Sequence, residues 1–127
     1  MEKLVHAAAQ TPDVEVCGLL VGNDGAVQDV VMTTNTAADP SRSFEIDPAA
    51  LLRTHREARG GGMAVIGHWH SHPNGVPSPS ARDAARALDN GQIWLIVAGG
   101  AVQGWIAQAA DPMLMAGRFA AVTLVTD

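Results

Sequence analysis

The sequence predicts an α/β (α+β) fold packed as one compact set of layers. Short apolar runs bounded by turn residues read as strands, and they occur before, between and after three helical patterns. The chain has 127 residues, of which 47% are hydrophobic, which is enough for one domain with a sizeable core. We therefore expect a single domain over residues 1–127.

The first part of the chain predicts a helix and a β-hairpin. Residues 2–10 have apolar residues on one side and form a short helix that stops near Pro12. Residues 15–22 read as a buried strand and residues 27–35 as its partner. Between them, Asn23-Asp24-Gly25 is a strong hairpin signal, because such residues tolerate the positive φ of a tight turn.

A loop over residues 36–43 and a short strand over 43–46 lead into the second helix. Asp47-Pro48 suits the start of this helix, with Asp as the N-cap and Pro at the first helical position. Gly60-Gly61-Gly62 ends it. We expect four residues to share its inner face: Leu51, Leu52, His55 and Ala58.

The second half predicts four further strands and one helix. Residues 63–69 form an apolar strand, and a rigid loop with three prolines follows over 73–79. The third helix spans 80–89, with Asn90-Gly91 as its C-cap. The expected hairpin strands that follow are 92–98 and 101–108, joined by Gly99-Gly100; residues 111–117 show no clear pattern, and a last strand is expected over 118–125.

The most informative motif is His70-Ser71-His72-Pro73, followed by Ser80-Ala81-Arg82-Asp83. Two histidines two residues apart on an extended segment project to the same face. A carboxylate at the start of the next helix, Asp83, can complete a set of three ligands. Two histidines and one carboxylate, with a fourth position open to water, are typical of catalytic zinc sites. The motif therefore predicts a metal site and hydrolysis.

Each candidate residue also has a structural interpretation. Ser80 and Asp83 match a capping box, and we expect that Asp83 cannot easily serve both as cap and as ligand. Glu15 is either the general base or a solvated residue at a strand edge. His68 shares the face of the two histidines, but a fourth ligand would close the site. We expect it further into the strand, with its hydrogen bonds satisfied.

Composition argues against several classes of function. The net charge is −5, only eight residues are Lys or Arg, and aromatic residues make up 4%, so nucleic acid is a poor partner. No apolar run approaches the roughly 18 residues of a membrane span, and the N-terminus lacks the pattern of a secretory signal. A single cysteine, Cys17, suits a reducing compartment, so we expect a cytoplasmic protein.

The chain resembles the JAMM/MPN-domain (JAB-type) zinc metalloproteases, especially their small bacterial stand-alone members. Three blocks carry the resemblance: Pro12-Asp13-Val14-Glu15-Val16-Cys17-Gly18-Leu19-Leu20-Val21-Gly22, residues 35–48 with Phe44-Glu45-Ile46-Asp47-Pro48, and residues 67–83 with His70-Ser71-His72-Pro73. The resemblance implies a curved mixed β-sheet flanked by helices in a cytidine-deaminase-like arrangement, with the site at a sheet edge.

The resemblance also implies a role for each site residue. His70, His72 and Asp83 would bind one Zn²⁺ per chain. Glu15 would take the proton of the attacking water, and Ser80 would hydrogen-bond the developing oxyanion.

Family resemblance further implies cleavage of the peptide or isopeptide bond after the Gly-Gly tail of a ubiquitin-like protein. The chain is too short for long specificity insertions, so we expect a sulfur-carrier protein rather than polyubiquitin as the partner. The alternatives are a hydrolase of another small peptide or amide and a non-catalytic MPN interaction module. The sequence leaves open the carrier, the residue after the scissile bond, the metal preference and the oligomeric state.

Overall fold

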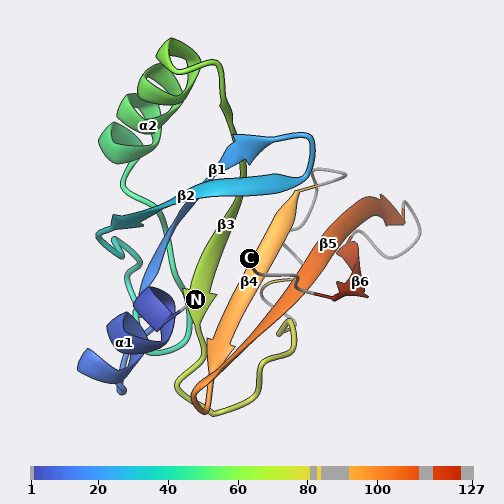
Figure 1. Ribbon diagram of the computed structural model, residues 1–127. Helices are drawn as coiled ribbons and strands as arrows, with labels where there is room; N and C mark the ends of the chain where they lie inside the picture. Colours follow the sequence, from blue (N-terminus) through green and yellow to red (C-terminus); the bar gives the residue numbers. More distant parts are fainter. Residues whose placement is uncertain (1, 81–82, 84–91, 112–115, 124–127) are drawn as a thin grey trace.

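The computed structural model describes residues 2–80, 83, 92–111 and 116–123. Its strands form one six-stranded sheet in the order β2-β1-β3-β4-β5-β6 (Figure 1). The elements are α1 (Glu2–Gln10), β1 (Cys17–Asn23), β2 (Ala26–Thr33), α2 (Pro48–Gly60), β3 (Ala64–Ser71), β4 (Ile93–Ala98), β5 (Ala101–Asp111) and β6 (Ala116–Val122). Strands β3 and β4 are parallel, and the other neighbours are antiparallel. The predicted mixed sheet with helices is confirmed.

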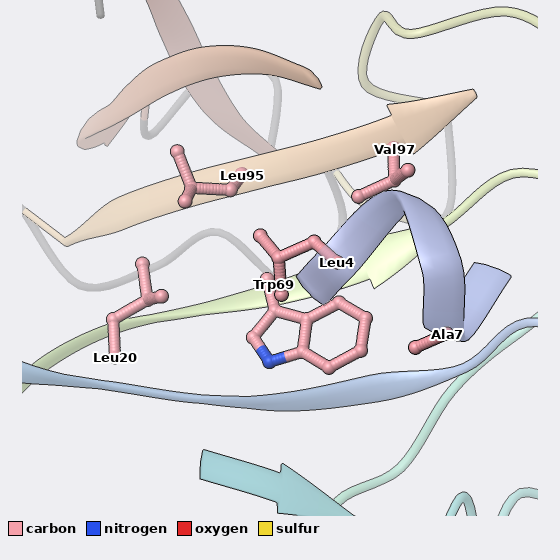
Figure 2. Close-up of a cluster of buried hydrophobic side chains, with 6 residues drawn as sticks. All are labelled: Leu4, Ala7, Leu20, Trp69, Leu95 and Val97. Carbon is pink, nitrogen blue, oxygen red and sulfur yellow. The ribbon is translucent and has the colours of Figure 1, made fainter. Parts of the chain in front are cut away.

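Helix α1 packs on one face of the central strands. Figure 2 shows the side chains of this core, which come from α1, β1, β3 and β4: Leu4, Ala7, Leu20, Trp69, Leu95 and Val97. Burying a large side chain of this kind contributes about 1.5–3 kcal/mol, so this core fixes α1 against the sheet. Because side chains alternate along β3, Trp69 on this face places His68 and His70 on the other face.

The opposite face carries a second, aromatic layer. Its buried members are Cys17, Phe44, Trp94 and Ala107. The ring of Phe44 stacks on the ring of His70, with centroids 4.4 Å apart and planes 19° from parallel. His70 is therefore held in a fixed orientation by apolar neighbours before any ligand interaction is considered.

Both predicted hairpins are present. Asp24 (φ 49°) and Gly25 (φ 76°) join β1 to β2, and Gly99 (φ 57°) and Gly100 (φ 80°) join β4 to β5. Two consecutive residues with positive φ form the tight turn that matches the twist of the flanking strands.

The ends of α2 agree with the sequence, but of the four residues predicted for its inner face only Ala58 is buried. The Asp47 side chain accepts the backbone N–H of Ala49 at 3.2 Å, and the helix ends at Gly60. Three residues of α2 are fully buried: Ala50, Thr54 and Ala58. These small residues recur every four positions, so they form a stripe that packs closely on β1 and β3. Leu52 lies on the far side of this stripe and is 51% exposed.

Several predicted boundaries change. The strand expected over 43–46 is reduced to an isolated bridge between Asn35 and Ile46. The last strand starts at Ala116 and ends at Val122, and the predicted end at 125 lies outside the described residues.

Most of the predicted helix over 80–89, with its cap at 90–91, also lies outside those residues, although Asp83 is described and helical. No helix in the described part of the chain is long and apolar enough to span a membrane. The single domain over 1–127 stays a prediction.

Candidate metal centre

Three of the candidate residues converge at the end of β3. His70 is the penultimate residue of the strand, His72 follows it, and Asp83 reaches them from beyond the proline-rich loop. The two Nε2 atoms of the histidines lie 3.0 Å apart. Oδ2 of Asp83 lies 3.3 Å from Nε2 of His70 and 3.0 Å from Nε2 of His72. All three side chains are buried. The site, which was expected at a sheet edge, thus lies at the end of the inner strand β3 and not along either of the outer strands, β2 and β6.

This triangle of atoms fits a bound metal ion. Tetrahedral bonds of about 2.0–2.1 Å place neighbouring ligand atoms about 3.3 Å apart, close to the separations of these three. Two imidazole nitrogens and one carboxylate oxygen are also a donor set that divalent transition metals accept. The arrangement is compatible with a metal site and does not by itself specify the metal.

The hydrogen bond of Nδ1 determines the tautomer of neutral His72. Nδ1 lies 2.8 Å from the carbonyl oxygen of Val76, to which its N–H donates, so Nε2 keeps its lone pair for a ligand interaction. Burial lowers the pKa of His72, but hydrogen bonds to Asp83 and to the Val76 carbonyl outweigh burial and raise the pKa above its usual value. A metal ion at this site therefore competes with a proton on His72.

Asp83 serves as a helix cap and faces the histidines at the same time. Its Oδ2 accepts the backbone N–H of Ser80 at 2.8 Å, and its own N–H donates to Oγ of Ser80 at 3.1 Å. This is the reciprocal capping box, and the same oxygen lies near both histidines, whereas the role of Asp83 as a metal ligand stays a prediction. A carboxylate oxygen has two lone pairs, which here point in two directions.

The charge state of Asp83 also suits a ligand. Burial opposes ionisation and would raise its pKa, but hydrogen bonds to His70 and His72 hold the pKa well below its usual range. The carboxyl group is therefore ionised at neutral pH, which is the form that binds a metal.

The register of the sheet brings Glu15 to this centre. Cys17 of β1 pairs with His70 of the antiparallel strand β3. Two residues before Cys17 and two residues after His70, the same register therefore places Glu15 level with His72. The ligand atoms of Glu15, His70 and His72 lie within 4.8 Å of one another. Glu15 is only 5% exposed, so the alternative of a solvated glutamate at a strand edge is wrong.

Ser71, which the sequence analysis did not single out, ties the two chain segments together. Its Oγ accepts the backbone N–H of Val16 at 2.9 Å, and its own N–H donates to the carbonyl of Val16 at 2.9 Å. The sequence signal for this role was a small hydroxyl residue between two candidate ligands. These bonds fix the spacing between Glu15 and the histidines.

With this geometry established, comparison with known proteins becomes informative. The sequence profile of the family described as "Prokaryotic homologs of the JAB domain" matches residues 1–111. The chain belongs to this family. The resemblance to JAB-type proteases inferred from the sequence motifs is thereby confirmed.

Three named relatives of this JAB-family chain are two desampylases and a probable conjugate-cleaving protease. A desampylase of Haloferax volcanii is 38% identical over 98 residues, covering 73% of this chain and 70% of the relative. A desampylase of Pyrococcus furiosus is 37% identical over 105 residues, covering 82% and 74%. A probable TtuB-protein conjugate cleaving protease of Thermus thermophilus is 31% identical over 86 residues, covering 68% and 57%.

Solved structures agree with the fold. The solution structure of a protein from Desulfitobacterium hafniense is 28% identical and superposes with a TM-score of 0.72, covering 99% of this chain and 88% of the other. A protein from Salinibacter ruber, also 28% identical, gives a TM-score of 0.64, with coverage of 99% and 86%.

Among the described residues of this JAB domain, His68 lies outside the group of side chains that could hold a metal ion. His68 lies on β3 two residues before His70, and its ring packs edge-on against Trp94, with centroids 4.0 Å apart. It also lies 5.1 Å from the ring of Phe44. The expected position further into the strand is thus observed, whereas the hydrogen bonding of His68 stays a prediction.

Asn35 connects the segments that border the centre. Its Nδ2 donates to the carbonyls of Glu15 (2.8 Å) and Ser43 (3.0 Å). Its Oδ1 accepts the backbone N–H groups of Ala37 and Glu45, each at 3.0 Å. All four hydrogen-bonding positions of the amide are therefore used: three order the segment after β2, and one joins it to Glu15, just before β1. The sequence offered no signal for this role beyond an asparagine after a strand.

We expect Asn35→Asp to destabilise the fold by about 2–3 kcal/mol, because two donors are lost and a carboxylate then faces two carbonyl oxygens. Urea unfolding measures this change. Asn23→Asp at the exposed end of β1 is the matched control and should lie within about 0.5 kcal/mol of wild type. Equal midpoints for the two variants would contradict the role of Asn35.

A cleft with a volume of about 320 Å³ opens beside the centre. We call it the site cleft, and its lining residues are Glu15, Ser41, Arg42, His72, Pro73, Asn74 and Ser80. A second hollow of about 270 Å³ lies between α1, the end of β3 and the β4–β5 turn, and it shares His72 and Pro73 with the site cleft. A substrate that crosses His72 would therefore contact both hollows.

Proposed function

We propose that this JAB-family chain is a zinc-dependent hydrolase that cleaves the peptide or isopeptide bond after the Gly-Gly tail of a ubiquitin-like sulfur-carrier protein. The observation that carries the proposal is the convergence of His70, His72 and Asp83 within 3.0–3.3 Å, with Glu15 in reach. The names of three relatives, two desampylases and a TtuB-conjugate cleaving protease, support the substrate class.

His70, His72 and Asp83 would hold the zinc ion. When bound, zinc acts as a Lewis acid that polarises the scissile carbonyl and lowers the pKa of water. The protein supplies two neutral imidazoles and one ionised carboxylate. The capping bonds of Asp83 and the His72–Val76 bond keep two of these side chains in place before the metal arrives.

Glu15 would act as general base and then as general acid. Its buried carboxylate takes one proton from the attacking water as the C–O bond forms. It returns that proton to the leaving amine nitrogen as the C–N bond breaks, so the carboxylate is regenerated. A positioned carboxylate of this kind typically contributes a factor of about 10²–10⁴ to the rate.

Ser80 would stabilise the oxyanion. Its Oγ accepts the backbone N–H of Asp83 through one of its two lone pairs, and the hydroxyl hydrogen would be the donor to the substrate oxygen. Ser80 lines the site cleft, where the carbonyl oxygen of a substrate would become negative.

Metal removal tests the proposal. Purified protein with one equivalent of Zn²⁺ is incubated with a ubiquitin-like sulfur-carrier protein bearing residues beyond its Gly-Gly end, and separately with an isopeptide-linked conjugate. Mass spectrometry should show cleavage after the second glycine, loss of cleavage with a chelator, and recovery with added zinc.

Other outcomes point to the alternatives. Bound zinc without cleavage of either substrate would favour a hydrolase of another small peptide or amide. Absence of metal binding would favour a non-catalytic interaction module in which Ser80 and Asp83 only cap a helix. The cytoplasmic location expected from the single cysteine stays a prediction.

A further inference from the structure

The site cleft contains one strongly basic side chain. Among the lining residues of the described chain, Arg42 alone is a lysine or arginine. The carboxylates of Glu15 and Asp83 together carry two negative charges, which a divalent metal would offset. Apart from an exposed pair with Asp39, the charge of Arg42 is then not offset by the described residues that line the cleft, which favours an anionic group on the bound molecule.

The contact between Arg42 and its own acidic neighbour is weak. Nε of Arg42 lies 4.0 Å from Oδ2 of Asp39, and the two side chains are 74% and 52% exposed. Oδ1 of the same carboxylate accepts the hydroxyl of Ser41 at 2.6 Å. An exposed pair at this separation is screened by water, so it holds the guanidinium loosely. The donors of Arg42 are therefore accessible to a substrate.

The backbone beneath Arg42 is nevertheless fixed relative to the centre. The N–H groups of Arg42 and Ser43 both donate to the carbonyl of Asp39, at 3.2 and 3.1 Å, which closes a turn. The carbonyl of Pro40, within this turn, accepts the backbone N–H of Glu15 at 2.7 Å. The side chain at position 42 is thus exposed at its tip, and its backbone belongs to a segment bonded to the proposed general base.

The second hollow differs in character. Among the residues that the structure describes, those that line it include no lysine, arginine, aspartate or glutamate. A charged part of a substrate that crosses His72 is therefore expected on the side of the site cleft, and uncharged parts are expected on the side of the second hollow.

We propose that Arg42 binds a carboxylate that the substrate carries close to the scissile bond, and that it selects substrates with such a group. The inference rests on the proposed function, because it concerns the substrate of the same site. The guanidinium fork matches a carboxylate with two parallel hydrogen bonds. The carboxylate can be the terminal one of a short extension beyond Gly-Gly or an acidic side chain, and these two sources share one chemistry.

Three extended carrier proteins test the inference. Each carries one residue past Gly-Gly: alanine with a free carboxylate, alanine as the carboxamide, or glutamate as the carboxamide. With wild type we expect a KM about tenfold lower for at least one carboxylate-bearing protein than for the alanine carboxamide. Whichever carboxylate-bearing carrier has the lower KM shows whether Arg42 recognises the terminal carboxylate or the carboxylate of an acidic side chain. The advantage should shrink in high salt.

Variants locate the effect. Arg42→Ala should raise the KM for the preferred carboxylate substrate to the value for the alanine carboxamide, whereas Arg42→Lys should keep part of the difference. Arg53→Ala is the matched control, since Arg53 is exposed on α2 and does not line the cleft. It should behave as wild type.

Binding without turnover separates this inference from the proposed function. Calorimetry with zinc-loaded Glu15→Gln protein measures the Kd of the same three carriers, and we expect the order seen in KM. Equal values with and without a carboxylate, or equal losses for all three carriers in Arg42→Ala, would overturn the inference. Failure of wild type to cleave any carrier would remove the proposed function, and the Kd values would still decide whether Arg42 recognises a carboxylate.

Discussion

Glu15→Gln is expected to lower the rate of cleavage by about 10²–10⁴-fold, while the protein still folds and binds one equivalent of zinc. The substitution keeps the size of the side chain but removes its ability to accept a proton. The backbone bonds that hold residue 15 in place, to Pro40 and Asn35, do not involve the side chain and should persist. Single-turnover cleavage assays measure the rate, and metal analysis of the same sample measures occupancy.

Glu57→Gln provides the control for this experiment. Glu57 is exposed on α2, so losing its charge should change neither rate nor metal content. Cleavage by Glu15→Gln at the rate of the control would show that Glu15 is not the base. Loss of zinc together with activity would instead make Glu15 a ligand or a structural support.

Asp83→Asn is expected to reduce zinc affinity by at least about 100-fold while the helix cap is kept. The amide oxygen of asparagine can still accept the N–H of Ser80, so the cap is preserved. It carries no charge, however, and neutral amides bind zinc far more weakly than carboxylates do. Competition with a chromogenic chelator measures the affinity, and thermal unfolding of the metal-free proteins measures the stability.

Ser80→Ala reverses the pattern and serves as the matched variant. It removes the oxygen that accepts the N–H of Asp83, so it should destabilise the metal-free protein by about 1 kcal/mol. Its zinc affinity should remain close to that of wild type. If Asp83→Asn binds zinc as tightly as Ser80→Ala, Asp83 is a helix cap and not a ligand.

The local parts of the fold were predictable because short patterns determine them. Asn23-Asp24-Gly25 and Gly99-Gly100 supply the positive φ values that tight hairpins require. Asp47 followed by Pro48 starts a helix through one side-chain hydrogen bond and one fixed φ. The inner face of α2 was predicted correctly only at Ala58, because the sheet accepts the stripe of small residues Ala50, Thr54 and Ala58 rather than the larger Leu51 and Leu52.

By itself the sequence determined which residues are the candidates for the chemistry. Alternation along one strand places His70 and His72 on one face, and Asp83 follows at a helix start, whatever the rest of the chain does. Only the tertiary structure decided what surrounds them. The pairing of Cys17 with His70 brings Glu15 level with His72, and the side chain of Asn35 donates a hydrogen bond to the carbonyl of Glu15. The turn that carries Arg42 is held there by Pro40. Strand register and loop contacts of this kind depend on the packing of the whole sheet, and no short pattern encodes them.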